Sequence, residues 1–152
     1  MNINEMKEIK DDETLVNTLY DFFDEKSRLN CSKAARVEFT TTVRYIERYL
    51  KKGMRILDIG AGAGEYSFYF VNKGYQVNAV ELADKNVVEF RKKLTDSTNI
   101  DLRQGNALDL SYFADETFDI VLLLGPLYHL HDREDRNMAI REAKRVLKKE
   151  GI

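Results

Sequence analysis

Apolar positions in the first fifty residues recur with the period of an α-helix. Over residues 14–28 they form one stripe, which predicts an amphipathic helix. Ser32 is a suitable N-cap for a second helix, whose apolar stripe continues until two lysines and Gly53 indicate its end. We therefore expect a two-helix extension over residues 1–52.

After Gly53 the pattern changes to short apolar runs of strand length, separated by segments long enough for helices. The runs cover residues 55–59, 75–80, 100–103 and 118–124. We expect helices over residues 65–73, 84–94 and 133–149, with Asp84 and Asp132 as the N-caps of the second and third. This alternation is typical of the α/β class, in which crossover helices cover a parallel sheet.

The first of these strands leads directly into a glycine-rich loop. Gly60, Gly62 and Gly64 follow the strand at alternate positions, and Glu81 comes at the end of the next apolar run. Glycine lets the backbone approach a ligand at distances that a Cβ atom would block. An acidic residue one strand away can bind both hydroxyls of a ribose. The pattern predicts a site for an adenosine-containing cofactor.

The spacing of the glycines distinguishes two kinds of cofactor. The dinucleotide motif Gly-x-Gly-x-x-Gly would need a third glycine at position 65, where this chain has Glu65, whose carboxylate would repel a pyrophosphate. A nicotinamide oxidoreductase is therefore disfavoured. With Asp58 two residues ahead of the loop, the chain resembles the class I S-adenosylmethionine-dependent methyltransferases from about residue 55 to its last residue. The resemblance implies a Rossmann-like parallel sheet with strand order 3-2-1-4.

By this resemblance, cofactor-binding residues lie after the first three strands. They are Asp58, Gly60, Ala61, Gly62 and Gly64 for the methionine part, Glu81 for the ribose, and Leu82, Asn106, Ala107 and Leu108 around the adenine. Many relatives have aspartate where this chain has Asn106, whose carbonyl is still an acceptor. Taken alone, Asp58 is equally well explained as a structural carboxylate that caps the loop, and Asn106 as a turn residue.

The fourth strand is followed by a segment that resembles the passage between cofactor and methyl acceptor in methyltransferases. Gly125 is counted among the cofactor-binding residues. It also replaces the polar first residue of the Asn-Pro-Pro-Tyr motif, which is found in enzymes that methylate amino groups of nucleic acids. No nucleobase substrate is therefore inferred. His129 is a candidate general base or, equally, a packing residue. Tyr128 is a second catalytic candidate, although a wall of the pocket explains it more simply. His129 and His131 are poorly spaced for a metal, and none is expected.

The N-terminal helices supply candidate residues for a lid over the cofactor. These are Tyr20, Arg36, Glu38, Phe39 and Thr42. Most aromatic residues at helical spacing are core residues, so each is more simply explained by packing than by ligand contact.

Composition sets wider limits. The 152 residues suit one domain, and a net charge of -2 with 43% apolar and 33% charged residues gives no indication of nucleic-acid binding. The single Cys31 excludes an internal disulfide, which favours a cytoplasmic location. The longest apolar run, residues 120–127, is much shorter than the roughly 20 residues of a membrane-spanning helix.

The sequence thus predicts an S-adenosylmethionine-dependent methyltransferase with a small-molecule acceptor. A non-catalytic cofactor-binding or interaction module is the alternative. Because the chain ends where the related fold would start its fifth strand, we expect one incomplete domain over residues 1–152, with residues 53–152 as the Rossmann-like half. The strand at 118–124 would then be an apolar edge, through which a homodimer could form.

Overall fold

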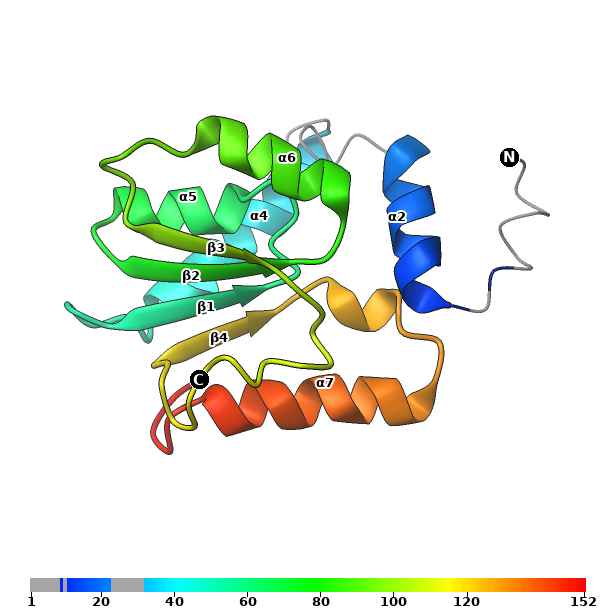
Figure 1. The fold of residues 1–152 in the computed structure, drawn as a ribbon. Coiled ribbons are helices and arrows are strands. Elements are labelled where there is room, and N and C mark those ends of the chain that lie inside the picture. Colours follow the sequence, from blue (N-terminus) through cyan, green and yellow to red (C-terminus); the bar gives the residue numbers. More distant parts are fainter. Residues whose placement is uncertain (1–8, 10, 23–31) are drawn as a thin grey trace.

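A four-stranded parallel sheet forms the centre of the computed structural model, which describes residues 9, 11–22 and 32–152 (Figure 1). The strands are β1 (Arg55–Ile59), β2 (Gln76–Glu81), β3 (Ile100–Gln104) and β4 (Ile120–Leu123). Their order in the sheet is β3-β2-β1-β4, so the predicted α/β class and strand order are confirmed. Since all four strands are parallel, their carboxyl ends lie along one edge of the sheet.

Helices cover both faces of the sheet (Figure 1). One face carries α4 (Lys33–Glu47), α5 (Glu65–Asn72) and α6 (Asp84–Lys93), and the other carries α7 (Arg133–Val146). The alternation of side chains along β1 separates the two cores: Leu57 packs with Val146 of α7, and Ile56 packs with Phe70 of α5. The remaining helix, α2 (Asp12–Phe22), lies at the carboxyl ends of the strands (Figure 1).

Several predicted boundaries differ from the structure. The N-cap of α6 is Ala83, and Asp84 is its first helical residue. The second predicted helix, α4, ends at Glu47, well before residue 53, although Ser32 caps its start as expected. The last helix ends at Val146 because Leu147 leaves it to pair with Phe118. The helix predicted over residues 14–28 corresponds to α2, which begins earlier, at Asp12. Residues 23–28 of that prediction lie outside the described residues.

β4 is shorter than the apolar run that predicted it and lies at one edge of the sheet. The final residue, Ile152, pairs with the start of this edge: its N–H donates to the Asp119 carbonyl at 3.0 Å, and its carbonyl accepts from the Val121 N–H at 2.8 Å. The predicted homodimer through this edge stays a prediction.

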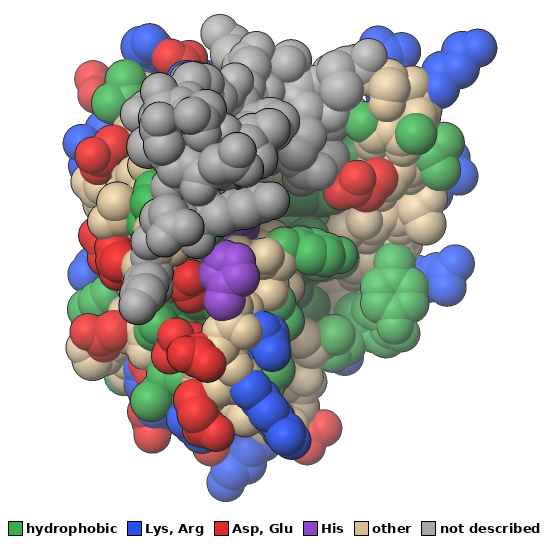
Figure 2. Space-filling model, turned by 90° about the vertical axis from the view of Figure 1, so that its right-hand side faces the viewer, with side chains coloured by type: hydrophobic (Ala, Val, Ile, Leu, Met, Phe, Trp, Pro, Cys, Tyr) green, Lys and Arg blue, Asp and Glu red, His purple; other side chains and the backbone are tan. Residues whose placement is uncertain are grey.

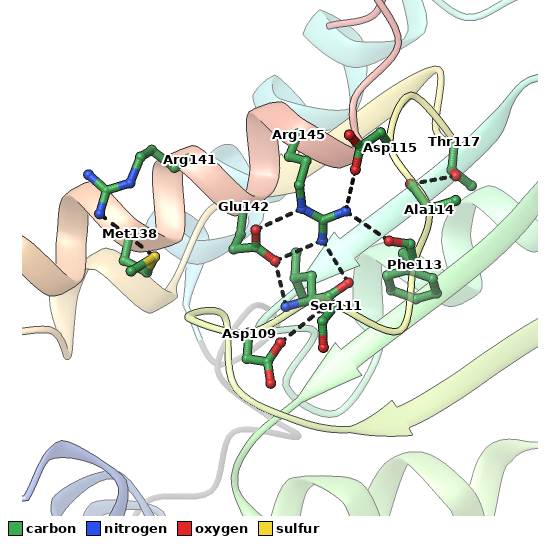
Figure 3. Close-up of polar contacts among 11 residues, drawn as sticks. Asp109, Ser111, Phe113, Ala114, Asp115, Thr117, Met138, Arg141, Glu142 and Arg145 are labelled. Atoms are coloured by element: carbon green, nitrogen blue, oxygen red, sulfur yellow. Dashed lines mark hydrogen bonds and ion pairs between the residues drawn. The ribbon is translucent and has the colours of Figure 1, made fainter.

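Arg145 of α7 fixes the long connection between β3 and β4 (Figure 3). Its guanidinium binds both carboxylate oxygens of Glu142 at 2.8 Å and Asp115 at 2.8 Å. It also donates to the carbonyls of Phe113 and Leu110, at 2.8 and 2.9 Å. The connection contains no helix or strand among the described residues, so its position depends on these contacts.

We expect Arg145→Ala to lower the free energy of unfolding by about 2 to 3 kcal/mol, since hydrogen bonds to charged groups contribute about 1.5 to 3 kcal/mol each and are not additive. Arg145→Lys should lose most of the same stability because an ammonium group lacks the planar fork. Urea unfolding measures both. The control is Arg141→Ala on the same helix, where the guanidinium contacts the Met138 sulfur at 3.7 Å. Equal losses for Arg141→Ala and Arg145→Ala would contradict the assignment.

Candidate functional site

A cleft opens at the carboxyl ends of the strands, beneath α2. Its lining comes from α2 and from the segments that follow all four strands: Asp12, Glu13, Val16 and Tyr20; Gly60; Glu81 and Leu82; Gly105, Asn106 and Ala107; Gly125, Pro126, His129 and Leu130. Six of the eleven cofactor-binding positions expected from the sequence therefore meet in one cleft: Gly60, Glu81, Leu82, Asn106, Ala107 and Gly125.

The glycine loop turns sharply over the end of β1. The N–H groups of Gly60 and Ala61 both donate to the Val80 carbonyl, at 2.8 and 3.1 Å. Gly60 has a φ of 72°, and a Cβ atom there would lie 2.5 Å from the Pro126 ring. Only glycine fits this position, and the result is a bare stretch of backbone facing the cleft.

Behind Gly60 the loop is packed into the protein. Gly64 precedes α5 with a φ of 90°, and a Cβ atom on it would lie 2.6 Å from the Phe90 ring and 2.8 Å from Phe68. Ala61 and Gly62 are also buried, and neither belongs to the cleft lining. Of the four loop residues predicted to contact the cofactor, Gly60 lines the cleft, and the other three, Ala61, Gly62 and Gly64, are buried behind it.

Glu81 joins the glycine loop to the end of β2. One carboxylate oxygen accepts the N–H of Gly62 at 2.7 Å. The other accepts the N–H of Ala83 at 2.8 Å and the side-chain amide of Asn86 at 3.3 Å. Although Glu81 is only 5% exposed, it lines the cleft. Its charged carboxylate is thus held in a fixed orientation where the hydroxyls of a ribose would meet it.

Asp58 lies beside this site but does not line the cleft. It is 3% exposed and accepts the hydroxyl of Ser67 at 2.7 Å. Burial raises the pKa of Asp58 to about 6, the negative charge of Glu81 adds to the increase, and the Ser67 hydrogen bond opposes it. The described contact joins Asp58 to Ser67 in the first turn of α5, which fits a structural carboxylate.

The pKa of Asp58 predicts an unusual pH dependence. Because the folded-state value of about 6 lies above the ordinary 3.8, the native state binds the proton more tightly, and stability falls as the pH rises between these values. At 1.36 kcal/mol per pH unit, this loss amounts to about 3 kcal/mol. Asp58→Asn keeps an acceptor for Ser67 and should remove the loss. Urea unfolding of both proteins at pH 4 and pH 7.5 measures it, and identical pH dependence would contradict the burial argument.

The segment after β3 contributes a turn to the cleft. Asn106 and Ala107 line it as predicted, and so does Leu82 from the end of β2. The side-chain oxygen of Asn106 accepts the N–H of Leu108 at 3.0 Å, which makes Asn106 a turn residue as well. Leu108 itself packs against the core beneath α7 and lies outside the lining, contrary to expectation.

The segment after β4 forms the 3₁₀ helix η1 (Pro126–Tyr128). Residues three apart share a face of such a helix, so Pro126 and His129 both point to the cleft. Tyr128 lies a third of a turn away and is 86% exposed, so it forms no wall of the cleft. Gly125 lines the cleft as predicted.

α2 bridges the two rims of the cleft. On one rim, Asp12 lies 2.6 Å from the Nδ1 atom of His131 and accepts the His131 N–H at 3.2 Å. On the other, the Asn17 side chain accepts the N–H of Asp84 at 3.0 Å, and Lys85 donates to the Tyr20 carbonyl at 2.8 Å. The cleft is therefore covered by a helix with polar contacts at both ends.

The lid candidates are only partly placed at the cleft. Tyr20 lines it, whereas Arg36, Glu38, Phe39 and Thr42 of α4 do not. Phe39 packs between Tyr66 and Tyr69, with ring centroids 5.1 and 5.5 Å away. The cleft is also lined by Asp12, Glu13 and Val16, which no sequence motif indicated. The four-residue spacing of Asp12, Val16 and Tyr20, which places them on one helix face, was the available signal.

The lining is acidic. Among the lining residues that the structure describes, three are carboxylates, Asp12, Glu13 and Glu81, and none is lysine or arginine. Figure 2 looks onto this end of the molecule, where acidic side chains lie next to a histidine. A cleft with this charge suits a cationic ligand. No three His, Cys, Asp or Glu residues of the described chain are grouped to hold a metal, and no described helix is long and apolar enough to cross a membrane.

Comparisons with known proteins agree with this geometry. The family profile described as "Methyltransferase domain" matches residues 57–152. The ubiquinone biosynthesis O-methyltransferase of Azorhizobium caulinodans is 34% identical over 102 residues, which are 66% of this chain and 39% of that enzyme. The chain thus spans well under two thirds of this relative.

Solved structures show the same fold. The PH0226 protein of Pyrococcus horikoshii has a TM-score of 0.71 and 28% identity, over 85% of this chain and 63% of that one. The glycopeptide N-methyltransferase MtfA, solved with S-adenosylmethionine, has a TM-score of 0.62 and 26% identity, over 74% of this chain and 47% of that one. The chain therefore belongs to the class I methyltransferase family, whose cofactor is S-adenosylmethionine.

Proposed function

We propose that this chain binds S-adenosylmethionine in the cleft beneath α2 and transfers its methyl group to a small-molecule acceptor. The observation that carries the proposal is the pairing of Glu81 with the glycine loop, because one carboxylate both fixes the loop and faces the cleft. The acidic lining supports it, since the cofactor carries a positive sulfonium and an ammonium group.

Each part of the cleft has a role in this proposal. The Gly60 backbone borders the methionine part, Glu81 accepts from the ribose hydroxyls, and Asn106 with Ala107 borders the adenine. The bound cofactor supplies an activated methyl group, so the protein mainly contributes alignment and exclusion of water. Gly125 and His129 occupy the end of the cleft nearest β4, where we place the acceptor.

A non-catalytic cofactor-binding module remains the alternative function, and it predicts binding without transfer. The names of the two relatives differ in the atom that is methylated, oxygen or nitrogen, so they leave the acceptor of this chain open. We place the protein in the cytoplasm, because its one cysteine cannot form an internal disulfide.

Calorimetric titration with S-adenosylhomocysteine tests the cofactor site, with reduced nicotinamide dinucleotide as the control ligand. We expect binding of the first at one site per chain and none of the second. No binding of S-adenosylhomocysteine, or tighter binding of the dinucleotide, would overturn the assignment. Transfer of labelled methyl groups to extracts of small metabolites then separates the enzyme from the non-catalytic module.

A further inference from the structure

Tyr20 and His129 meet across the cleft, although they come from different ends of the chain. The Tyr20 hydroxyl lies 3.3 Å from the Nε2 atom of His129, and the ring centroids are 5.7 Å apart. Both residues line the cleft, one from α2 and the other directly after η1. The hydroxyl and the imidazole are therefore a polar pair at the end of the cleft that we assign to the acceptor.

The position of this pair depends on contacts of both partners. Lys85 holds the Tyr20 backbone to the start of α6, and Asp12 holds the same helix to His131, two residues after His129. The backbone N–H of His129 donates to the Pro126 carbonyl at 3.0 Å, which closes η1. The pair is thus assembled only when α2 covers the cleft.

The charges of the cleft lining limit the kind of acceptor. Asp12 and Glu13 line the cleft from the first turn of α2, and no lysine or arginine belongs to the described lining. An anionic acceptor such as a carboxylate or a phosphate would meet repulsion from these carboxylates. An uncharged or cationic acceptor would not. Such an acceptor keeps its proton at neutral pH and must lose it for transfer to be completed, which is the task of a general base.

We propose that Tyr20 and His129 form a proton-accepting pair, and that the acceptor is an uncharged or cationic molecule with a hydroxyl or amine group. This proposal rests on the proposed function. The acceptor's proton passes to the Tyr20 oxygen, and the Tyr20 proton passes to Nε2 of His129, which becomes positively charged. A cationic amine must lose this proton before the transfer, because its nitrogen has no free electron pair until then. The acceptor oxygen or nitrogen forms a bond to the methyl carbon as the carbon–sulfur bond breaks, and the electron pair of the broken bond stays on the sulfur. With an uncharged acceptor the single positive charge of the sulfonium ends on His129, and with a cationic amine two positive charges are present before and after, one on His129 and one on the methylated amine at the end.

The contact is tested by nitrogen NMR of the histidine rings, because the chain has only two histidines and His131 serves as an internal reference. A His129→Gln variant assigns the signals. In the wild type we expect Nε2 of His129 to be the unprotonated nitrogen, and Tyr20→Phe should shift its signal while the His131 signals stay in place. Thr18→Val, which removes a hydroxyl from the same helix, is the matched control. A protonated Nε2, or the same spectrum for Tyr20→Phe and the wild type, would overturn the proposal.

The acceptor class is tested with three probes of one size on protein saturated with S-adenosylhomocysteine: benzyl alcohol, benzylamine and benzoate. We expect the first two to shift the His129 signal and benzoate to leave it unchanged. Tyr20→Phe should weaken the response by about threefold or more, since it removes one hydrogen bond. A response to benzoate, or to none of the probes, would overturn the proposal. The contact between Tyr20 and His129 is measured by NMR on the protein without cofactor. A protein that shows this contact but binds no cofactor would therefore refute the proposed function and leave the contact established.

Discussion

Replacing Glu81 with alanine is expected to lower the affinity for S-adenosylhomocysteine by about 100-fold, because hydrogen bonds to a charged group contribute about 1.5 to 3 kcal/mol. The substitution removes the group that we propose binds the ribose and also frees the loop, since Glu81 accepts the Gly62 N–H at 2.7 Å. Glu81→Gln should lose nearly as much. The two oxygens of Glu81 accept the N–H groups of Gly62 and Ala83. In glutamine one oxygen is replaced by an NH₂ group, which is a donor and cannot accept from the facing N–H.

Glu65→Gln is the matched control for the loss of a nearby negative charge. Glu65 begins α5 directly after the glycine loop, but its carboxylate pairs with Lys93 at 2.9 Å and does not line the cleft. Calorimetry should show a change of about threefold or less for this variant, because Glu65 lies outside the cleft lining and its charge is already paired with Lys93. Equal losses for Glu65→Gln and Glu81→Ala would mean that only long-range charge matters, and the ribose assignment would be wrong.

Gly64→Ala is expected to destabilise the protein strongly, with a loss of about 2 to 5 kcal/mol. The backbone at Gly64 has a φ of 90°, which costs an alanine about 1 to 2 kcal/mol. Its Cβ atom would also lie 2.6 Å from the buried Phe90 ring, and forcing atoms into a packed core costs about 1 to 3 kcal/mol.

Gly74→Ala separates these two causes. Gly74 has a φ of 89°, nearly the same as Gly64, but a Cβ atom there would meet nothing within 4 Å. Its loss should therefore be limited to the backbone cost of about 1 to 2 kcal/mol. Urea unfolding of the two variants under the same conditions gives the difference. If both lose the same stability, the contact between Gly64 and Phe90 has no energetic role.

Several elements were predictable because their signals are local in the chain. Gly53 and the change in apolar period after it marked where the sheet begins, and β1 was predicted with its observed bounds. Helix ends were less well predicted. Leu147 leaves α7 to pair with Phe118, a partner 29 positions earlier in the chain, and nothing near Leu147 in the sequence indicates that pairing.

The sequence by itself determined that the glycine loop and Glu81 lie together at one edge of the sheet. A glycine loop and Glu81 at consecutive strand ends must meet in a parallel sheet, because all carboxyl ends share one edge. Only the tertiary structure decided which side chains complete the cleft. It turned Tyr128 outward, and it brought Tyr20 to His129, 109 positions away. Such a contact depends on how α2 packs across the finished sheet, which no local pattern of residues specifies.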